Sequence, residues 1–157
     1  MSENTFKLLK PEVGKAIYDL KWERFRLIQD ESIKSIVKTK NDIIISAPTA
    51  SGKTEAAFLP TISESVPEIN NTLKIVYISP LKALINDQFF RIENLCRHLK
   101  CKVTKWHGDA SQTLKDKLLT SPSGIILITP ESLESFLINR NSLLFELFKN
   151  VDYYIID

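Results

Sequence analysis

Two short runs in this sequence are apolar at every position: Ile43-Ile44-Ile45 and Ile125-Ile126-Leu127-Ile128. A half-exposed antiparallel strand alternates apolar and polar residues, whereas a parallel strand covered by helices on both faces is apolar throughout. Similar runs recur along the chain, and longer segments of helical periodicity separate them. The sequence therefore predicts an α/β fold, with a parallel sheet and helices on both of its faces.

The expected elements follow from these periodicities. Strands are predicted at Asp42–Ala47, Lys74–Ile78, Val103–Trp106, Gly124–Thr129 and Asp152–Ile156. Helices are predicted within Ile17–Thr39, over Glu55–Leu59, Lys82–Leu99 and Ser111–Leu119, from Glu131 or Ser132, and over Leu143–Phe148. In the helix that starts at Lys82, one apolar stripe is expected to face the sheet: Ile85, Ile92, Leu95, Cys96 and Leu99.

Length and composition exclude several classes of protein. The chain has 157 residues, of which 43% are hydrophobic and 25% charged, values typical of one globular domain and not of a disordered chain. No run approaches the roughly 18 consecutive apolar residues that a membrane span needs. The two cysteines are too few for a disulfide scaffold, so we expect a cytoplasmic protein. A net charge of +2 does not by itself indicate a nucleic-acid partner.

The segment Ala47-Pro48-Thr49-Ala50-Ser51-Gly52-Lys53-Thr54 has the composition of a phosphate-binding loop. It lies between a predicted strand and a predicted helix, which is the context that such a loop requires. There, backbone N–H groups at a helix N-terminus converge on phosphate, and Gly52 lets the backbone approach closely. Lys53 would reach the β- and γ-phosphates, and the Thr54 hydroxyl would bind Mg²⁺. A chance Gly-Lys-Thr in an ordinary turn is the alternative, which the flanking elements disfavour.

Together with later segments, this loop resembles the motifs of superfamily 2 helicases of the DEAD/DEAH type. The residues of these segments are most similar to those of the Lhr-like branch. The resemblance runs from about Trp22 to Asp157, which leaves residues 1–21 as an N-terminal extension of a single partial RecA-like domain. Ala47 replaces the first glycine of the generic loop, as it does in motif I of these helicases, although they often have glycine where this chain has Ala50. The other matching segments are Ser79–Leu84 (motif Ia), Trp106–Asp109, Thr129–Leu133 (motif Ib) and Val151–Asp157 (the strand before motif II).

This resemblance implies the ATP-binding first motor domain of a nucleic-acid helicase. It carries ATP contacts to Gln29 and to the loop residues Thr49, Ala50, Ser51, Gly52, Lys53 and Thr54. It carries catalytic roles to Lys53 and Asp157, and Mg²⁺ ligation through the nucleotide to Thr54 and Asp157. By the same resemblance, a DNA or RNA strand, expected to be single-stranded, would contact Pro80, Lys82, Gly108, Thr129 and Pro130.

Some of these residues have a simpler interpretation. Gln29 could be a polar residue on an exposed helix face, and Trp22 and Phe25 could be core aromatics instead of parts of an adenine pocket. A zinc site built from Cys96, His98, Cys101 and His107 is disfavoured, because Cys96 and His98 face different directions on a helix and no CxxC pair exists.

The sequence ends at Asp157, whereas the family continues with a glutamate that orients the attacking water. The coupling motif, the second RecA-like domain and its arginine also lie beyond that position. We therefore expect this chain to be part of a longer helicase, with the C-terminal helicase domain as its partner, and to be inactive in ATP hydrolysis by itself. In the family a later strand lies between the loop strand and the motif II strand, so we expect a gap there, or altered pairing or fraying of Asp152–Ile156.

Two other functions are compatible with parts of this sequence. A non-catalytic module that binds nucleotide or single-stranded nucleic acid would also explain these residues. A P-loop kinase or GTPase would explain the phosphate loop but not motifs Ia and Ib.

Overall fold

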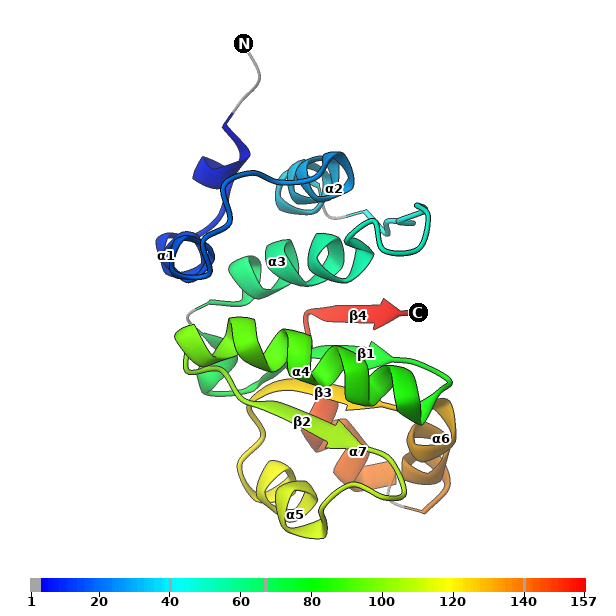
Figure 1. Cartoon of the computed structure of the whole chain (residues 1–157). Coiled ribbons are helices and arrows are strands. Elements are labelled where there is room, and N and C mark those ends of the chain that lie inside the picture. The colour runs from blue at the N-terminus through cyan, green and yellow to red at the C-terminus, as the bar shows by residue number, and fades with distance from the viewer. Residues whose placement is uncertain (1–3, 40, 67, 140) are drawn as a thin grey trace. The chain divides into compact units, whose positions relative to one another are not determined.

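The computed structural model describes residues 4–39, 41–66, 68–139 and 141–157. The chain divides into two compact units, Met1–Val66 and Pro67–Asp157, and each is described by itself. Figure 1 shows the helical first unit in blue to cyan and the second, which holds the sheet, in green to red. Among the described residues, no helix is both long and apolar enough to cross a membrane.

The first unit contains the short 3₁₀ helix η1 (Thr5–Leu8) and the α-helices α1 (Pro11–Asp19), α2 (Leu27–Lys38) and α3 (Lys53–Ser65). Helix α3 contacts both α1 and α2. The helix expected within Ile17–Thr39 is present as α2, where Ile33 is fully buried. Leu27, the first residue of that helix, is 79% exposed.

The strand predicted at Asp42–Ala47 is wrong for the structure described here. Residues 42–47 belong to no strand or helix, and Ile44 is 95% exposed. An apolar run becomes a strand only when its backbone finds a partner. In residues 4–39 and 41–66 the regular elements are all helices, so this unit offers no strand with which to pair.

The second unit is a parallel four-stranded sheet with the order β2-β3-β1-β4. Its strands are β1 (Leu73–Ile78), β2 (Val103–Trp106), β3 (Gly124–Ile128) and β4 (Tyr153–Ile156), within one residue of the other four predictions. Each residue of β3, and every residue of β1 except Ile78, is buried, as expected for strands covered on both faces. Strand β4 pairs with β1 from Ile75↔Tyr153 to Ile78↔Ile156, so the alternative of fraying is wrong.

Helices cover both faces of this sheet (Figure 1). Helix α4 (Lys82–His98) buries the predicted stripe from Ile85 to Cys96. On the opposite face lie α5 (Gln112–Thr120), α6 (Pro130–Asn139) and α7 (Asn141–Phe148), and the short η2 (Glu68–Asn70) precedes β1. The core on this second face is formed by Leu73, Val76, Trp106, Leu118, Ile126, Ile128, Phe136 and Leu147.

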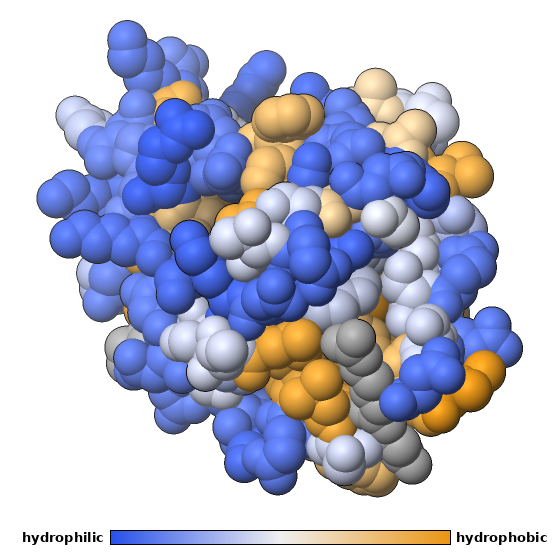
Figure 2. All heavy atoms as spheres, turned by 90° about the horizontal axis from the view of Figure 1, so that it is seen from below, coloured by the Kyte–Doolittle hydropathy of each residue, from blue (hydrophilic) through white to orange (hydrophobic). Residues whose placement is uncertain are grey.

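Not every apolar side chain of these helices is covered. Leu137, Ile138 and Phe145 on α6 and α7 are more than half exposed. Figure 2, which views the molecule from below, shows hydrophobic groups within a mainly hydrophilic surface. Single exposed apolar residues of this kind are common on globular proteins.

Candidate nucleotide and nucleic-acid site

The predicted phosphate loop connects an extended segment to the first turn of α3. Helix α3 begins at Lys53, so the N–H groups of its first turn have no acceptor within the helix. Gly52 adopts φ +92°, a left-handed conformation that glycine accepts without steric penalty. Ala50 adopts φ +58° in the same loop, where a side chain is unfavourable. The loop therefore has the backbone shape that glycine favours at two positions, one of which carries alanine.

The Lys53 ammonium is held by carbonyl groups of the loop itself. Its Nζ donates to the carbonyl oxygens of Ala47 at 2.7 Å and Pro48 at 2.9 Å. Lys53 thus lies across the loop, on the same turn as the free N–H groups of α3. An ammonium in this position suits a bound phosphate, and it would exchange carbonyl partners for phosphate oxygens.

Gln29 is 4% exposed, so its interpretation as a polar residue on an exposed helix face is wrong. Its Oε1 accepts a hydrogen bond of 3.0 Å from the backbone N–H of Arg26, which closes the N-terminus of α2. Its Nε2 donates a longer bond of 3.5 Å to the carbonyl oxygen of Gly52. The side chain of Gln29 therefore connects α2 to the phosphate loop, 23 residues further along the chain.

Arg26 makes a second connection, which sequence reasoning missed. Its guanidinium donates a hydrogen bond to the carbonyl oxygen of Ala50. The aromatic residues before it have separate environments: Phe25 stacks on Phe6 with ring centroids 4.1 Å apart, and Trp22 is half-buried. Phe25 is half-buried and stacks within the first unit, so it is not part of the fully buried core.

The loop residues also fit a nucleotide phosphate. The hydroxyl of Ser51 is buried without a hydrogen-bond partner among the described residues, although it lies in a loop rich in polar groups. Buried hydroxyl groups normally have a partner, so this one is available to a ligand. The cradle is narrow: a Cβ at Gly52 would lie 2.5 Å from Gln29 Nε2. Donors, a cation and a close-approach glycine are the groups that phosphate requires.

Asp157 lies in the second unit, directly after β4, so its position is described separately from that of Lys53. Its backbone N–H donates to the carbonyl oxygen of Ile78, and its Oδ2 accepts a 2.7 Å hydrogen bond from the hydroxyl of Tyr77. Burial, and then the bond to Asp157, raise the pKa of Tyr77 well above its usual range. The phenol therefore keeps its proton and remains a donor to this carboxylate. No local sequence pattern indicates this role of Tyr77.

The predicted nucleic-acid residues gather at one edge of the sheet. The register pairs Ile78 with Ile128 and Trp106 with Ile128, so β1, β2 and β3 end side by side. Directly after these strand ends lie Pro80, Gly108, Thr129 and Pro130. The structure thus brings together residues separated by 50 positions in the sequence, at the edge where parallel sheets bind ligands.

Two further contacts define this edge. Lys82 forms an ion pair of 2.8 Å with Asp109, and a Cβ at Gly108 would lie 3.5 Å from the Lys82 ammonium. Lys82 holds the pKa of Asp109 below its usual range. The Thr129 hydroxyl donates to Ser132 Oγ at 3.1 Å and accepts a long bond from the Ser132 N–H, so it caps α6. Lys82 is half-exposed and able to reach a phosphate.

The alternative of a zinc site gains no support. Within the described residues, no three His, Cys, Asp or Glu side chains gather as metal ligands would. His107 is 4% exposed, neither ring nitrogen has a hydrogen-bond partner in that part of the chain, and burial lowers its pKa. His107 is therefore a neutral core residue in this structure.

Comparison with known proteins identifies the family. The model of the DEAD/DEAH box helicase family matches residues 26–157. The ATP-dependent helicase Lhr-Core of Sulfolobus acidocaldarius is 34% identical over 143 residues, which cover 83% of this chain and 16% of that protein. Activating signal cointegrator 1 complex subunit 3 of Dictyostelium discoideum is 33% identical, covering 93% of this chain and 7% of its own length. The chain therefore belongs to the DEAD/DEAH box helicase family, and it spans only a small part of these relatives.

Solved structures agree on the fold. Helicase Lhr of Mycobacterium smegmatis, bound to single-stranded DNA and AMP-PNP, superposes with a TM-score of 0.79 at 24% identity, covering 99% of this chain and 21% of that one. The DEAD-box helicase Mss116, bound to single-stranded RNA, gives a TM-score of 0.84 at 22% identity, covering 99% and 33%. The parallel sheet with its helices is thus the RecA-like fold that the sequence predicted.

Proposed function

We propose that this chain is the ATP-binding first motor domain of a nucleic-acid helicase, and that its two units belong to one RecA-like domain. The observation that supports this most is the phosphate loop before α3, with Gln29 buried against it and Lys53 across it. Family membership gives this geometry its meaning, because the match includes Gln29, the loop and Asp157.

In this proposal each side chain has a stated task. Loop residues 49–54 bind the nucleotide phosphates through backbone N–H groups, with Lys53 neutralising their charge. Gln29 holds the loop and faces the adenine. Thr54 and, through water, Asp157 hold Mg²⁺, which when bound neutralises charge on the β- and γ-phosphates. Tyr77 orients the Asp157 carboxylate for that task.

The strand-end residues Pro80, Lys82, Gly108, Thr129 and Pro130 contact the backbone of a single nucleic-acid strand. Backbone groups, hydroxyls and a cation suit contacts to phosphate and sugar that ignore the base sequence. Turnover and strand movement need a second motor domain, since an arginine from a partner supplies about 10³–10⁵ in rate to such reactions. We therefore expect residues 1–157 alone to bind nucleotide without significant hydrolysis.

The test is a titration of the chain with Mg²⁺-ADP and Mg²⁺-GDP, followed by tryptophan fluorescence and melting temperature. Saturable binding of ADP in preference to GDP is expected. Lys53→Ala should abolish it while the chain stays folded, and Lys7→Ala, at an exposed lysine of the same unit, should leave it unchanged. Unchanged ADP affinity in Lys53→Ala would refute the assignment. Robust ATP turnover that Lys53→Ala removes would refute only the expected inactivity.

A further inference from the structure

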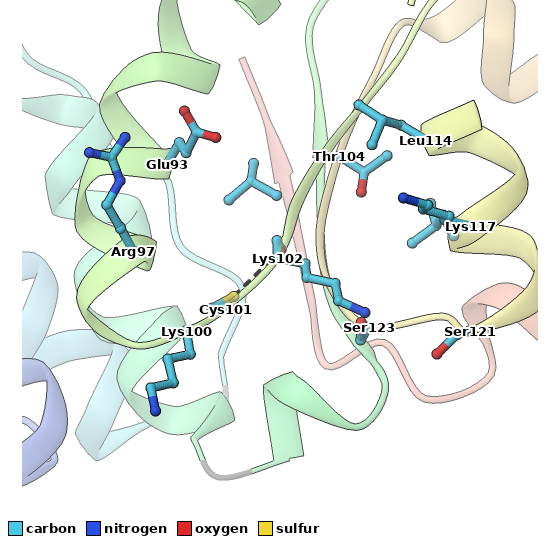
Figure 3. A pocket seen from close by; sticks show the side chains of 12 residues that line it. Glu93, Arg97, Lys100, Cys101, Lys102, Thr104, Leu114, Lys117, Ser121 and Ser123 are labelled. Atoms are coloured by element: carbon cyan, nitrogen blue, oxygen red, sulfur yellow. Dashed lines mark hydrogen bonds between the residues drawn. The ribbon is translucent and has the colours of Figure 1, made fainter. Parts of the chain in front are cut away.

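A cavity of about 490 Å³ lies in the second unit, away from the strand ends described above. It is enclosed by the C-terminal half of α4, by α5, and by the residues that begin β2 and β3. Figure 3 shows these elements around it. Because all strands are parallel, the beginnings of β2 and β3 form the edge opposite to Gly108 and Thr129. This cavity is therefore a separate site on the same sheet.

The side chains that line this cavity carry a strong excess of positive charge. Four are cations, Arg97, Lys100, Lys102 and Lys117, against the single carboxylate of Glu93. None of the four takes part in an ion pair among the described residues, although six other pairs exist there. In Figure 3, Lys102 extends from the start of β2 in the direction of Ser123, and Lys117 points from α5 toward the space between the helices. Arg97 and Lys100 project from the other side, at the rim.

Ser123 gives the cavity a neutral donor as well. It is 2% exposed, lines the cavity, and its hydroxyl has no hydrogen-bond partner within the described residues. A buried hydroxyl without a partner is uncommon, and a ligand oxygen at this position would satisfy it.

The floor next to Ser123 is fixed by the backbone. Gly124 adopts φ +83°, and a Cβ there would lie 1.9 Å from the carbonyl oxygen of Lys102, so no other residue fits. The same carbonyl oxygen accepts a 2.9 Å bond from the N–H of Ile125. The starts of β2 and β3 are thus locked together, and Ser123 and Lys102 are presented from neighbouring, rigid positions.

We propose that this cavity binds a phosphate group of a nucleic-acid strand, at a second contact distinct from the motif edge. Inside the cavity, Lys102, Lys117 and Ser123 supply two cations and a hydroxyl for one phosphate. Two further cations, Arg97 and Lys100, lie at the rim. They could contact neighbouring phosphates of a nucleic-acid strand, whereas a single small anion would leave them without a role. Leu114 and Leu118 add an apolar wall against which a sugar or base would lie.

The experiment measures binding of a fluorescent oligothymidylate and an oligouridylate to the whole chain between 50 and 200 mM salt. The double variant Lys102→Ala/Lys117→Ala should flatten the slope of log affinity against log salt by about 0.7, since the two cations bind one phosphate and each phosphate bound in a single strand contributes about 0.7. Across this range, the affinity of the double variant should then change about 2.6-fold less than that of the unaltered chain. The matched control Lys7→Ala/Lys15→Ala removes the same charge from exposed positions of the first unit and should leave the slope unchanged.

Ser123→Ala separates this pocket from diffuse electrostatics. It should lower oligonucleotide affinity about threefold with the salt slope unchanged, because a neutral hydrogen bond is lost. The melting temperature should stay the same or rise, since the variant removes a buried hydroxyl without a partner.

Equal slopes for the two double variants would overturn the proposal. The proposal would also be overturned if inorganic phosphate or a phosphoserine peptide binds in the cavity while Lys102→Ala/Lys117→Ala binds oligonucleotide with unchanged affinity. ADP titration of the same variants keeps this test separate from the proposed motor function. Intact ADP binding with an unaltered salt slope rejects the second contact alone.

Discussion

Tyr77, near the end of β1, donates a 2.7 Å hydrogen bond through its hydroxyl to Oδ2 of Asp157, 80 residues later in the sequence. Parallel pairing of β1 with β4 creates this contact, because Tyr77 lies opposite Ile155 and Asp157 follows two residues further. Tyr77 is 3% exposed, so its ring is fixed in the core and only its hydroxyl reaches the carboxylate. Asp157, the predicted first acidic residue of motif II, is thus held by a neutral donor from the adjacent strand.

Tyr77→Phe should therefore lower the free energy of unfolding by about 1 kcal/mol at pH 7, because it removes this bond and retains the ring. Burial of the phenol, and then this bond, also make the free energy of unfolding depend on alkaline pH. Because the folded pKa of Tyr77 is raised above the unfolded value near 10, the stabilisation is complete below pH 10 and is lost as pH rises toward the folded pKa. Urea unfolding from pH 7 to 11.5 should show the unaltered chain losing stability more steeply above pH 10 than Tyr77→Phe.

Tyr154→Phe is the matched control, since Tyr154 lies in β4 and is 56% exposed. Tyr154→Phe should have the same free energy of unfolding at pH 7 as the unaltered chain, and the same steep loss of stability above pH 10. Parallel pH curves for the unaltered chain and Tyr77→Phe would contradict the raised pKa of Tyr77, and equal stability at pH 7 would contradict the hydrogen bond to Asp157.

The sheet was largely predictable from the sequence, because apolar runs such as Ile125–Ile128 have few alternatives to a doubly covered strand. Residues 42–47 show where that reasoning fails. Their composition predicts a strand as well as that of β3 does, yet pairing depends on a neighbouring backbone that periodicity does not report. Helix α6 also begins one or two residues before the predicted Glu131 or Ser132, because Pro130 occupies its first position, where a proline is favourable.

The candidate site was predicted in its motifs but not in its supporting contacts. Gly52, Lys53 and Thr54 are consecutive, so their types and spacing can be recognised within one short stretch of sequence. The bonds from Tyr77 to Asp157 and from Arg26 to Ala50 join residues 80 and 24 positions apart, and no local pattern indicates them. Tertiary contacts of this kind require the fold to be known first.

Gln29→Ala should weaken both the helix start and the phosphate loop. It removes the acceptor of the Arg26 N–H and the donor to the Gly52 carbonyl oxygen, and we expect a loss of about 1–2 kcal/mol in the free energy of unfolding, with weaker ADP binding. Gln29→Glu keeps the acceptor but replaces the donor by a carboxylate that faces a carbonyl. It should retain more stability than Gln29→Ala while binding ADP no better.

Unfolding in urea and ADP titration measure the two effects separately. Gln112→Ala, at an exposed glutamine on α5, is the control and should change neither. If Gln29→Ala melts and binds ADP like the unaltered chain, the connection from α2 to the loop has no energetic importance.

Ala50→Gly should stabilise the chain, in contrast to most alanine-to-glycine changes. Alanine at φ +58° has a conformational penalty of about 1–2 kcal/mol that glycine avoids. Glycine loses about 0.4–1 kcal/mol through the greater entropy of the unfolded chain, so a net gain of about 0.5 kcal/mol is expected. Ala57→Gly, inside α3, is the opposite control and should lose about 0.5–1 kcal/mol. Urea unfolding of both variants measures these changes. Equal losses in the free energy of unfolding would mean that the conformation of residue 50 does not favour glycine.

The ion pair between Lys82 and Asp109 should regulate how strongly the strand-end edge binds nucleic acid. Both side chains are more than half exposed, so the pair contributes little to folding, and its effect should appear in binding. Lys82→Ala should lower affinity for single strands of any sequence and flatten the slope of log affinity against log salt by about 0.7. Asp109→Asn should act in the opposite direction, because it frees the Lys82 ammonium from its carboxylate partner and removes a negative charge from the edge.

Combining Lys82→Ala and Asp109→Asn in one double variant separates these effects. If Asp109 acts by engaging Lys82, then Asp109→Asn should raise affinity severalfold with Lys82 present and much less in Lys82→Ala. Binding of an oligothymidylate at several salt concentrations, with melting temperature as the check on folding, measures all four chains. An equal gain in both backgrounds would mean that Asp109 acts only through general repulsion of phosphate, and that the 2.8 Å pair does not control Lys82.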